Sequence, residues 1–491
     1  MKKYITTPIY YINAKPHLGH AYTTIAADVL ARYYRQKGDE VFFLTGTDEH
    51  GAKIAEAAKN AGQQPRIFAD QTSKLFEDLS KTLNFSNDAF IRTTNPSHEK
   101  IVQEFLQKLH DKELIYEKEY TGLYCIGCEK FLTEKDLVDG KCPDHKTAPQ
   151  QQSEKNWFFK LSQFESQIKK LIESDEIKVL PQTRKNEILS KIDQGLEDIS
   201  ISRAGVEWGI PVPWDEKQTI YVWVDALINY WSGPIIYQSE KVKSEKYESG
   251  SELNTTDDKR LATSDSFWPP DLHLVGRDIM WFHAVIWPAL LLAAEEKLPK
   301  EIYVQGYFTV DGQKMSKTVG NVIDPVELVD KFGADSVRYY VLRDFPFGED
   351  GDVSLERLKE RNNNDLAAGL GNVVQRVLSM IKRYGVAVKS EKIKVKGDLE
   401  IIGKLTEELK FQEALTEIWK EIASVNKSIA ESEPWKLEKE ERKEDLDLFL
   451  KKCYGRILQI ADLVDPYLPE TSRKIISQAK TLELVPIFEK F

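Results

Sequence analysis

The amino-acid sequence predicts an α/β protein in which a parallel-sheet domain is interrupted by an insertion and followed by an all-α helical bundle. Three observations support this fold class. A strand, a helix and a second strand follow one another near the N-terminus, the same alternation resumes after residue 222, and strand patterns stop after Asp352. Such a succession indicates a parallel βαβ unit, whose ligands bind beyond the carboxyl ends of the strands.

The first βαβ unit is predicted within the first fifty residues. Residues 2–12 are β-branched and aromatic and predict a strand, and residues 20–38 place apolar side chains at helical spacing before Gly38. An apolar strand then leads into the polar stretch "GTDEHG". The stretches "PHLGH" and "GTDEHG" are therefore expected on the same rim of the sheet.

The remaining chain is divided by changes of pattern. Residues 237–266 are polar and predict a surface loop. The apolar run 279–294 is shorter than the roughly 20 residues of a membrane-spanning helix, so we expect a buried helix and no membrane segment. The predicted parts are the first half of the α/β domain (1–112), a connective insertion (113–222), the second half of the α/β domain (223–325), a linker and contact region (326–360) and the helical bundle (361–491).

Composition narrows the class of protein. The 491 residues are enough for two to four domains. A net charge of -11 excludes nucleic-acid binding through bulk positive charge, although local basic patches remain possible. No export signal follows the N-terminal methionine, and the cysteine spacing is atypical of a secreted disulfide framework, so we expect a cytoplasmic location.

The stretch "KPHLGHA" places His17 and His20 around Gly19, at the predicted junction of strand and helix. Glycine lets the backbone approach a nucleotide, a helix N-terminus attracts anions, and imidazoles donate hydrogen bonds to phosphate. The alternative is that the two histidines only cap the helix. The motif alone does not decide between these two interpretations.

A second stretch, "DGQKMSKTVGN", carries Lys314 and Lys317 in a predicted short loop. Two lysines three residues apart can reach a triphosphate and offset charge in a transition state. The alternative is a solvated basic loop. The joint occurrence with the N-terminal histidines favours the nucleotide site.

A third stretch predicts a metal site. Cys125, Cys128, Cys142 and His145 have the spacing C-x2-C-x13-C-x2-H, which can close a tetrahedral Zn²⁺ site with no open position. A closed site indicates one structural zinc ion. The alternative is a set of unligated thiols.

Together these stretches resemble class I aminoacyl-tRNA synthetases. "TPIYYINAKPHLGH", "GTDEHG", the cysteine cluster, "VWVDALINYW", "GRDIMWFHAVIWPA" and "KMSKTVGN" are similar to the methionyl-tRNA synthetases, in the form with one zinc knuckle. The resemblance implies a Rossmann-type catalytic domain with a zinc-knuckle insertion and an all-α anticodon-binding domain. It also implies ATP-dependent attachment of methionine to tRNA(Met) through a methionyl-adenylate, in support of translation initiation and elongation.

The resemblance also assigns residues to sites. The implied catalytic residues are His17, His20, Lys314 and Lys317. The implied ATP-binding residues are these four with Gly19, Gly276 and Asp278. The implied methionine-binding residues are Ile9, Tyr11, Asp48, Trp223, Tyr230, Ile279 and His283. Arg203 is implied as a further active-site residue. From spacing alone, Trp223 and Tyr230 fit core packing equally well.

In the helical part, "GLGNVVQRVLSM" and "ESEPWKL" resemble anticodon-reading elements and imply roles for Asn372, Arg376 and Trp435. Asn372 and Arg376 are four residues apart and share a helix face, and Trp435 offers a plane on which an unpaired base can stack. The alternative is a solvated helix face with one ordinary tryptophan.

The expected partners are ATP with Mg²⁺, L-methionine and tRNA(Met). No room remains after residue 491 for an appended dimerising domain, so we expect a monomer. Two other functions remain open at this point: a catalytically silent, zinc-containing RNA-binding relative, and a synthetase for another amino acid. Two intact nucleotide motifs argue against the silent relative.

Overall fold

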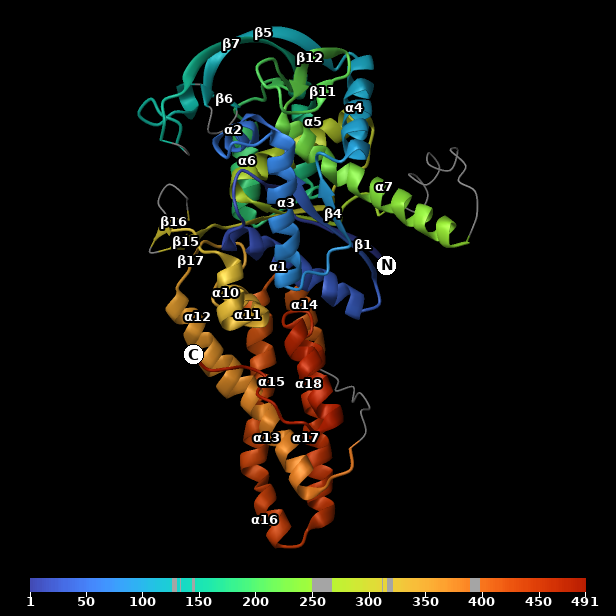
Figure 1. The fold of residues 1–491 in the computed structure, drawn as a ribbon, viewed down its shortest axis with the longest axis vertical. Helices are drawn as coiled ribbons and strands as arrows, with labels where there is room; N and C mark the ends of the chain where they lie inside the picture. Colours follow the sequence, from blue (N-terminus) through green and yellow to red (C-terminus); the bar gives the residue numbers. More distant parts are fainter. Residues whose placement is uncertain are drawn as a thin grey trace.

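The computed structural model describes residues 1–125, 130–132, 134–143, 146–249, 267–310, 312–315, 321–388 and 398–491. An α/β domain occupies the middle of the elongated molecule, an antiparallel ribbon arches over one end, and a helical bundle extends from the other (Figure 1). The predicted combination of fold classes is confirmed.

The centre of the α/β domain is a seven-stranded sheet in which every pairing is parallel. The strand order is β2, β3, β1, β13, β14, β8, with β4 also paired to β3. Their bounds are β1 (Lys2–Thr6), β2 (Tyr10–Tyr11), β3 (Glu40–Asp48), β4 (Ala89–Arg92), β8 (Lys178–Leu180), β13 (Leu272–Gly276) and β14 (Glu301–Gln305). Because all strands run the same way, their carboxyl ends meet at one edge.

The prediction of a single strand over residues 2–12 is wrong in one respect, because the chain forms two strands there, β1 and β2. Pro8 lies in the break, and proline has no N–H with which to continue a ladder. The predicted helix is confirmed as α1 (Leu18–Gln36), and Gly38 follows it with a φ of 91°. The break turns the chain so that Tyr10 and Tyr11 pair with the last residues of β3.

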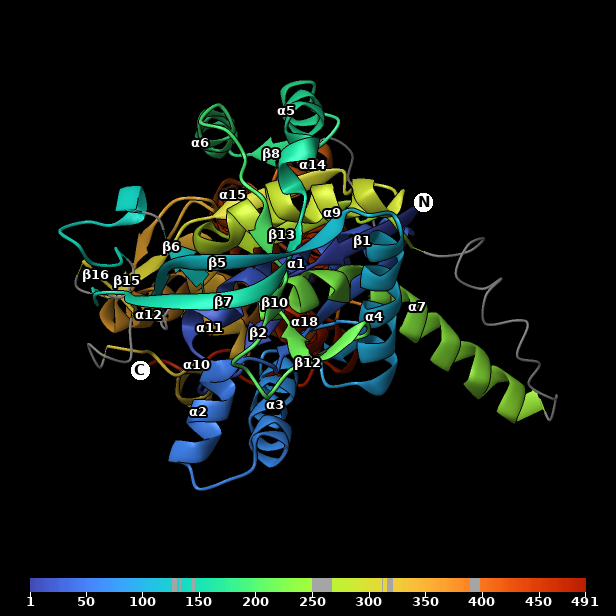
Figure 2. The same cartoon turned by 90° about the horizontal axis from the view of Figure 1, so that it is seen from above.

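Helices α1, α3 (Pro65–Thr82) and α7 (Val222–Ser249) pack against this sheet. The other helices of this part of the chain are α2 (Ala52–Asn60), α4 (Pro96–Asp111), α9 (Trp287–Ala294), α10 (Pro325–Phe332) and α11 (Ala334–Arg343), with the short helical turns η3 (Arg277–Ile279) and η4 (Phe282–Ile286) before α9. The prediction of a surface loop over residues 237–266 is wrong for residues 237–249. There α7 continues as a helix and projects from the body of the molecule (Figure 2). Glu and Lys are good helix formers, which explains the continuation.

The insertion is built from antiparallel strands. β5 (Ile115–Cys125) pairs with β7 (Gln150–Phe159), with β6 (Lys130–Leu132) on one side and β9 (Ile199–Ser200) on the other. A second small sheet contains β10 (Ser202–Arg203), β11 (Pro211–Val212) and β12 (Asp215–Ile220). The remaining elements are η1 (Glu134–Asp136), η2 (Leu161–Phe164), α5 (Glu165–Glu173) and α6 (Gln182–Ile192). One strand of the predicted insertion range, β8, pairs with β14 and so belongs to the central sheet.

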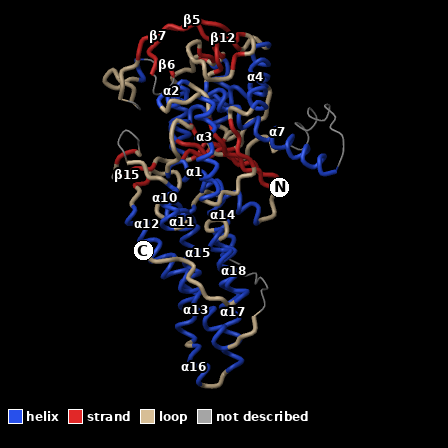
Figure 3. Tube along the Cα trace, viewed as in Figure 1, coloured by secondary structure: helices blue, strands red, loops and turns tan. Residues whose placement is uncertain are grey.

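After β15 (Phe308–Val310), β16 (Gln313–Lys314) and β17 (Gly351–Asp352), the described chain contains only helices (Figure 3). They are α12 (Leu355–Arg361), η5 (Asn362–Gly371), α13 (Asn372–Tyr384), α14 (Asp398–Glu407), α15 (Phe411–Ser432), α16 (Pro434–Lys439), α17 (Lys443–Val464) and α18 (Pro469–Thr481). Among the described residues, no helix has both the length and the apolar character needed to cross a membrane.

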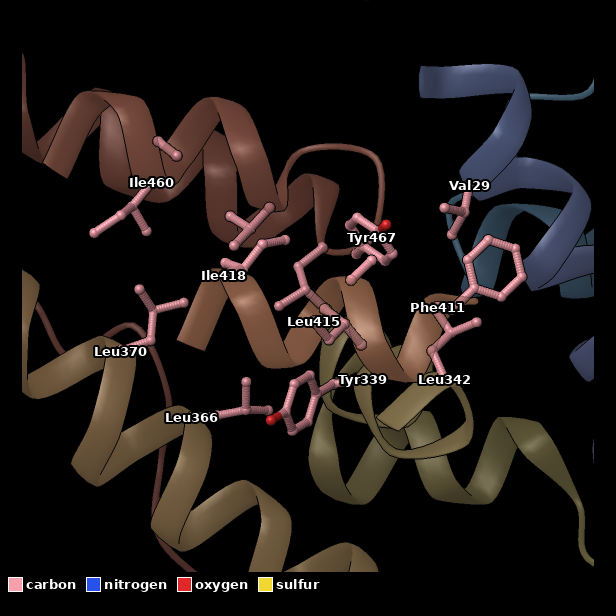
Figure 4. Close-up of a cluster of buried hydrophobic side chains, with 14 of the residues drawn as sticks. Val29, Tyr339, Leu342, Leu366, Leu370, Phe411, Leu415, Ile418, Ile460 and Tyr467 are labelled. Carbon is pink, nitrogen blue, oxygen red and sulfur yellow. The ribbon is translucent and has the colours of Figure 1, made fainter. Parts of the chain in front are cut away.

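The helical bundle shares its largest hydrophobic core with the α/β domain. Val29 of α1 belongs to the same cluster of buried side chains as Leu342 of α11, Phe411 of α15 and Ile460 of α17 (Figure 4). The bundle is therefore packed directly against the helix that begins with the predicted nucleotide motif.

Candidate active site

A cavity of about 300 Å³ opens at the carboxyl edge of the central sheet. Parts of the chain that are far apart in sequence form its walls: the β1–β2 break, the start of α1, the end of β3, the first turns of α7, and the segments after β13 and β14. Its walls include the following predicted site residues: Ile9, Tyr11, His17, Gly19, His20, Asp48, Trp223, Tyr230, Gly276, Asp278, Ile279 and His283. The structure thus brings the predicted methionine-binding and nucleotide-binding residues to one place.

The two motif histidines lie at the N-terminus of α1. His17 is the N-cap residue, and its backbone N–H donates to His20 Nδ1 at 3.2 Å. The two rings stack with centroids 3.6 Å apart, and the His20 ring also meets Tyr10 and Phe76 edge-on. The capping interpretation and the ligand-site interpretation therefore apply together, because the same rings cap the helix and line the cavity.

Gly19 is needed by this packing. A Cβ atom added there would lie 3.1 Å from atoms of the His17 ring, tighter than nearly all real Cβ contacts. The same position lies 3.8 Å from the methyl group of Met315, which belongs to the "KMSKT" stretch and also lines the cavity. The two sequence motifs therefore meet, although nearly three hundred residues separate them.

His283 and Tyr230 form a hydrogen-bonded pair at the apolar end of the cavity. Tyr230 Oη lies 2.7 Å from His283 Nε2, and His283 Nδ1 lies 2.9 Å from the carbonyl oxygen of Ile279. A carbonyl only accepts, so Nδ1 carries the proton and Nε2 accepts from the tyrosine. Burial lowers the pKa of His283 to about 4, and burial raises the pKa of Tyr230. Both side chains are therefore neutral at physiological pH.

The wall beside this pair is aromatic and carries one acid. Trp223 stacks on Phe282 with centroids 4.6 Å apart, and Tyr11 is partly buried against the same cluster. Asp48, at the end of β3, is 3% exposed and pairs in register with Tyr11. A carboxylate at the mouth of an apolar aromatic slot suits a small ligand with an ammonium group and an apolar tail.

The nucleotide side of the cavity contains Gly276, the last residue of β13, and Asp278, two residues later. A Cβ atom at Gly276 would lie 2.9 Å from Asp278 Oδ1, so a larger residue there would shift this carboxylate. A carboxylate accepts hydrogen bonds from hydroxyl groups, as a ribose would offer. The position at the end of a central parallel strand is the usual one for nucleotides in α/β sheets.

Arg203 is not among the residues that line the cavity. It lies on β10, is 5% exposed, and its guanidinium group stacks on the Tyr221 ring at 3.9 Å. Its Nη1 donates to Ser200 Oγ at 3.0 Å and to the Ser202 carbonyl at 2.7 Å. These contacts place it against Tyr221, the residue that precedes α7, and thus behind the part of the wall that α7 forms.

Two of the predicted phosphate ligands are described only in part or not at all. The backbone of Lys314 lies in β16, where it pairs with Thr309 of β15. Lys317 lies outside the described residues. The described neighbour, Met315, shows that this hairpin reaches the rim of the cavity.

Sequence patterns did not single out several residues of the wall. Gln305 ends β14, Tyr307 follows it, and Phe308 begins β15. The resumed strand pattern contains a signal for them, because the carboxyl end of the next parallel strand must meet the same edge. Met315 lies in the "KMSKT" motif, for which the sequence predicts roles of the lysines alone.

The predicted zinc residues are described in part. Cys125 and Cys142 are both 1% exposed and lie in a small buried cluster with Leu132 and Leu137. Cys128 and His145 lie outside the described residues. Within the described residues, no group of three or more histidine, cysteine or acidic side chains is placed to hold a metal ion.

The predicted anticodon residues lie on the bundle. Asn372 is exposed and Arg376 half-buried on α13, where Arg376 Nη1 lies 3.4 Å from Asn426 Oδ1. Trp435 is 41% exposed on α16, at the end of the bundle away from the cavity (Figure 1). A large aromatic side chain that stays exposed at such a tip is available to a partner.

The fold and the cavity agree with comparisons to known proteins. A family model described as tRNA synthetases class I (M) matches residues 3–153 and 145–378. The chain is 42% identical to the methionine–tRNA ligase of Caldanaerobacter subterraneus subsp. tengcongensis, over 100% of this chain and 76% of that one. It is 41% identical to the methionine–tRNA ligase of Thermotoga maritima, over 97% of this chain and 75% of that one.

Solved structures give the same picture. The Mycobacterium tuberculosis methionyl-tRNA synthetase in complex with methionyl-adenylate superimposes with a TM-score of 0.86 at 36% identity, covering 99% of this chain and 97% of that chain. The ligand-free form of the same protein gives a TM-score of 0.80 at 32% identity, covering 100% of this chain and 98% of that chain.

Proposed function

The chain belongs to the class I tRNA synthetases and, within them, to the methionine–tRNA ligases, and from this premise we infer that it joins methionine to tRNA in an ATP-dependent reaction. The reaction passes through methionyl-adenylate and releases pyrophosphate and AMP. One observation in this structure supports the function most directly. The predicted methionine-binding residues and the fully described ones among the predicted ATP-binding residues line a single cavity.

Methionine is proposed to occupy the aromatic end of the cavity. Asp48 binds the ammonium group, and Ile9, Tyr11, Trp223, Tyr230, Ile279 and His283 surround the thioether. Neutral Tyr230 and His283 support this assignment. Because they are uncharged and already hydrogen-bonded to each other, an apolar sulfur atom can lie beside them without leaving a polar group unpaired. Arg203 is proposed to support this wall from behind Tyr221.

ATP, with Mg²⁺, is proposed to bind against the start of α1. Gly19 and Gly276 let the nucleotide approach the backbone, Asp278 accepts from the ribose hydroxyls, and His17, His20, Lys314 and Lys317 contact the phosphates. The methionine carboxylate attacks the α-phosphorus, and the ribose hydroxyl at the tRNA terminus then takes the activated acyl group. The protein supplies positioning and charge stabilisation in both steps.

A structural Zn²⁺ is proposed in the insertion, held by Cys125, Cys128, Cys142 and His145. The buried Cys125 and Cys142 fit such a site, because thiolates are preferred zinc ligands and a small insertion gains stability from a closed metal site. The ion would order the insertion and take no part in the reaction.

Recognition of tRNA is proposed to use Asn372, Arg376 and Trp435 for the anticodon. The exposed Trp435 supports this role, since an unpaired base can stack on it. We propose that the protein acts as a monomer. A cytoplasmic location is proposed because zinc-binding thiolates suit a reducing compartment.

The test is amino-acid-dependent exchange of labelled pyrophosphate into ATP, run against a panel of amino acids. Methionine should support exchange about 100-fold better than leucine or isoleucine, a range that an apolar pocket can reach. Exchange with a different amino acid would reassign the substrate. Absence of exchange with every amino acid would indicate a silent relative.

A further inference from the structure

We propose that Asp225 is a positioning residue for the methionine subsite, because its buried carboxylate fastens the first turn of α7 to the end of β3 through His50 and to α4 through His98. The inference rests on the proposed function, since it concerns the methionine end of the cavity. Neither Asp225 nor the two histidines line the cavity, so none of them is assigned contact with the substrate.

The contacts form a closed buried network. Asp225 is 1% exposed, its Oδ2 lies 2.8 Å from His50 Nδ1, and its Oδ1 lies 2.8 Å from His98 Nε2. A carboxylate only accepts, so both imidazoles donate. His98 is fully buried, and its Nδ1 lies 2.7 Å from Ser232 Oγ, two turns further along α7.

Each arm of the network reaches an element of the methionine subsite. Asp225 lies on the first turn of α7 beside Trp223 and Ala226, which line the cavity, and Tyr230 follows on the same helix. His50 comes two residues after Asp48, the carboxylate assigned to the ammonium group. One carboxylate therefore sets the distance between the aromatic wall and the ammonium site.

The charges around the network favour an ionised Asp225 that accepts from both histidines. Burial lowers the pKa of His50, but its hydrogen bond to Asp225 and nearby acids outweigh burial and raise it. Burial raises the pKa of Asp225, but His50 and His98 outweigh burial and lower it. The other groups facing His50 are Glu99, 3.8 Å away, the edge of Trp208, and Glu49, which Arg92 holds in a bidentate pair.

A buried carboxylate held by two imidazoles contributes little to stability relative to an apolar contact. Its desolvation penalty offsets much of the attraction, and apolar residues of similar volume often stabilise a core equally well. Its geometric demands are strict, however, and it resists sliding of α7 against β3. Loss of this network is therefore expected to displace the methionine subsite more than it destabilises the fold.

The first test is Asp225→Asn in the full chain, with pyrophosphate exchange measured at varied methionine and at varied ATP. The KM for methionine should rise about tenfold, while the KM for ATP changes less than about twofold. An equal rise in both constants, or no rise in either, would overturn the proposal.

The second test is a pair of variants at His50. His50→Asn keeps a nitrogen donor near the position of Nδ1 and should retain a KM for methionine within about twofold of the parent, whereas His50→Leu removes the donor and should raise that KM about tenfold. Equal constants for the two variants would overturn the proposal. If Asp225→Asn does not fold, this pair gives the decision.

Exchange measured with the parent protein distinguishes failure of the proposed function from failure of the positioning role. If it shows no methionine-dependent exchange, the proposed function fails. If it exchanges normally and the His50 pair shows no difference, the positioning role alone fails.

Discussion

At the scale of single residues, some polar side chains of the cavity are held by one another before substrate arrives. Tyr230 Oη is held by His283, and the backbone carbonyl of Tyr230 accepts from Tyr4 Oη at 2.8 Å. His17 and His20 hold each other by stacking and by a backbone hydrogen bond. Preorganised groups of this kind lose little entropy when the substrate binds, which favours both affinity and rate.

Lys317 is the first residue to test. Lys317→Ala should lower the kcat of methionine-dependent pyrophosphate exchange by about 100-fold or more, since one charge-stabilising group is lost from the transition state. The KM for methionine should change little. Lys317→Arg keeps the charge and should retain more activity than Lys317→Ala. Near-parental exchange in Lys317→Ala would refute the phosphate role.

His283 should make folding stability depend on pH. The folded-state pKa of about 4 lies below the usual value of 6.5, so between these pH values the unfolded chain binds a proton that the folded chain does not. Stability from this group is complete above pH 6.5 and is lost as the pH falls toward 4, by up to about 3 kcal/mol.

Urea denaturation at several pH values between 4.5 and 6.5 checks this slope. His283→Gln, which cannot titrate, should show a shallower pH dependence than the parent. An equal slope in both proteins would count against a neutral, buried His283. His50, with its raised pKa, has the opposite sign and should weaken folding as the pH rises above 6.5.

At the scale of elements, function is distributed to the ends of strands and helices. Among the segments that form the cavity, three end or begin at one sheet edge: the end of β3, the start of α1 and the turn after β13. The small helix α16 carries Trp435 at the far end of the bundle (Figure 1). We therefore expect methionine activation and the proposed anticodon recognition to be separable by mutation.

Trp435→Ala should lower tRNA charging about tenfold or more, the effect expected when one stacked base loses its platform. Pyrophosphate exchange should stay within about twofold of the parent, because α16 is remote from the cavity. Leu448→Ala is the matched control, since Leu448 is 71% exposed on α17 and has no assigned role. Loss of charging and exchange together would contradict the anticodon role.

Zinc should be present in the purified protein at about one ion per chain, as a closed set of four ligands requires. Cys125→Ser and Cys142→Ser should lose the metal. Cys453→Ser should keep it, because Cys453 is a buried thiol on α17 outside the proposed site. Removing zinc with a chelator should expose the segment between β5 and β7 to protease. Full zinc content in Cys125→Ser would disprove the assignment.

At the scale of the whole molecule, a buried arginine pairs with α1 and also reaches the helical bundle. Arg338 on α11 is fully buried, and its Nη2 lies 2.8 Å from Asp28 Oδ2 on α1. The same guanidinium donates to the carbonyls of Leu83, Pro466 and Tyr467. This side chain therefore connects the helix of the nucleotide motif with the α17–α18 junction.

Arg338→Met should destabilise the protein by about 3–5 kcal/mol, because buried Asp28 keeps only Arg32 as a cationic partner and three backbone carbonyls lose their donor. Lys74→Met is the control: its partner Asp78 and Lys74 itself are half-exposed, and the effect should stay within about 0.5 kcal/mol. Urea denaturation measures both. A change in Arg338→Met as small as in the control would rule out a structural role for the pair.

The same pair predicts acid sensitivity. Burial raises the pKa of Asp28, but Arg338 and Arg32 outweigh burial and lower it below 3.8. The stability from this carboxylate is therefore present above pH 3.8 and is lost as the pH falls through the lowered pKa.

Much of the cavity could be predicted from sequence because its residues sit in short local motifs. His17, Gly19 and His20 mark one helix start, and Asp48 ends one apolar strand. Other features depend on contacts between distant segments and escaped prediction. The extent of α7, the membership of β8 in the central sheet and the Asp225 network belong to this second group.

The sequence by itself determined the fold class, the two nucleotide motifs and, through resemblance, the family, because periodicity and motif spacing are local properties of the chain. Only the tertiary structure decided that Met315 approaches Gly19, that Arg203 lies behind the wall and that one core unites bundle and catalytic domain. These outcomes depend on how helices pack across the sheet. Side chains that are hundreds of residues apart in the sequence come into contact in this packing, and local sequence patterns do not predict such contacts.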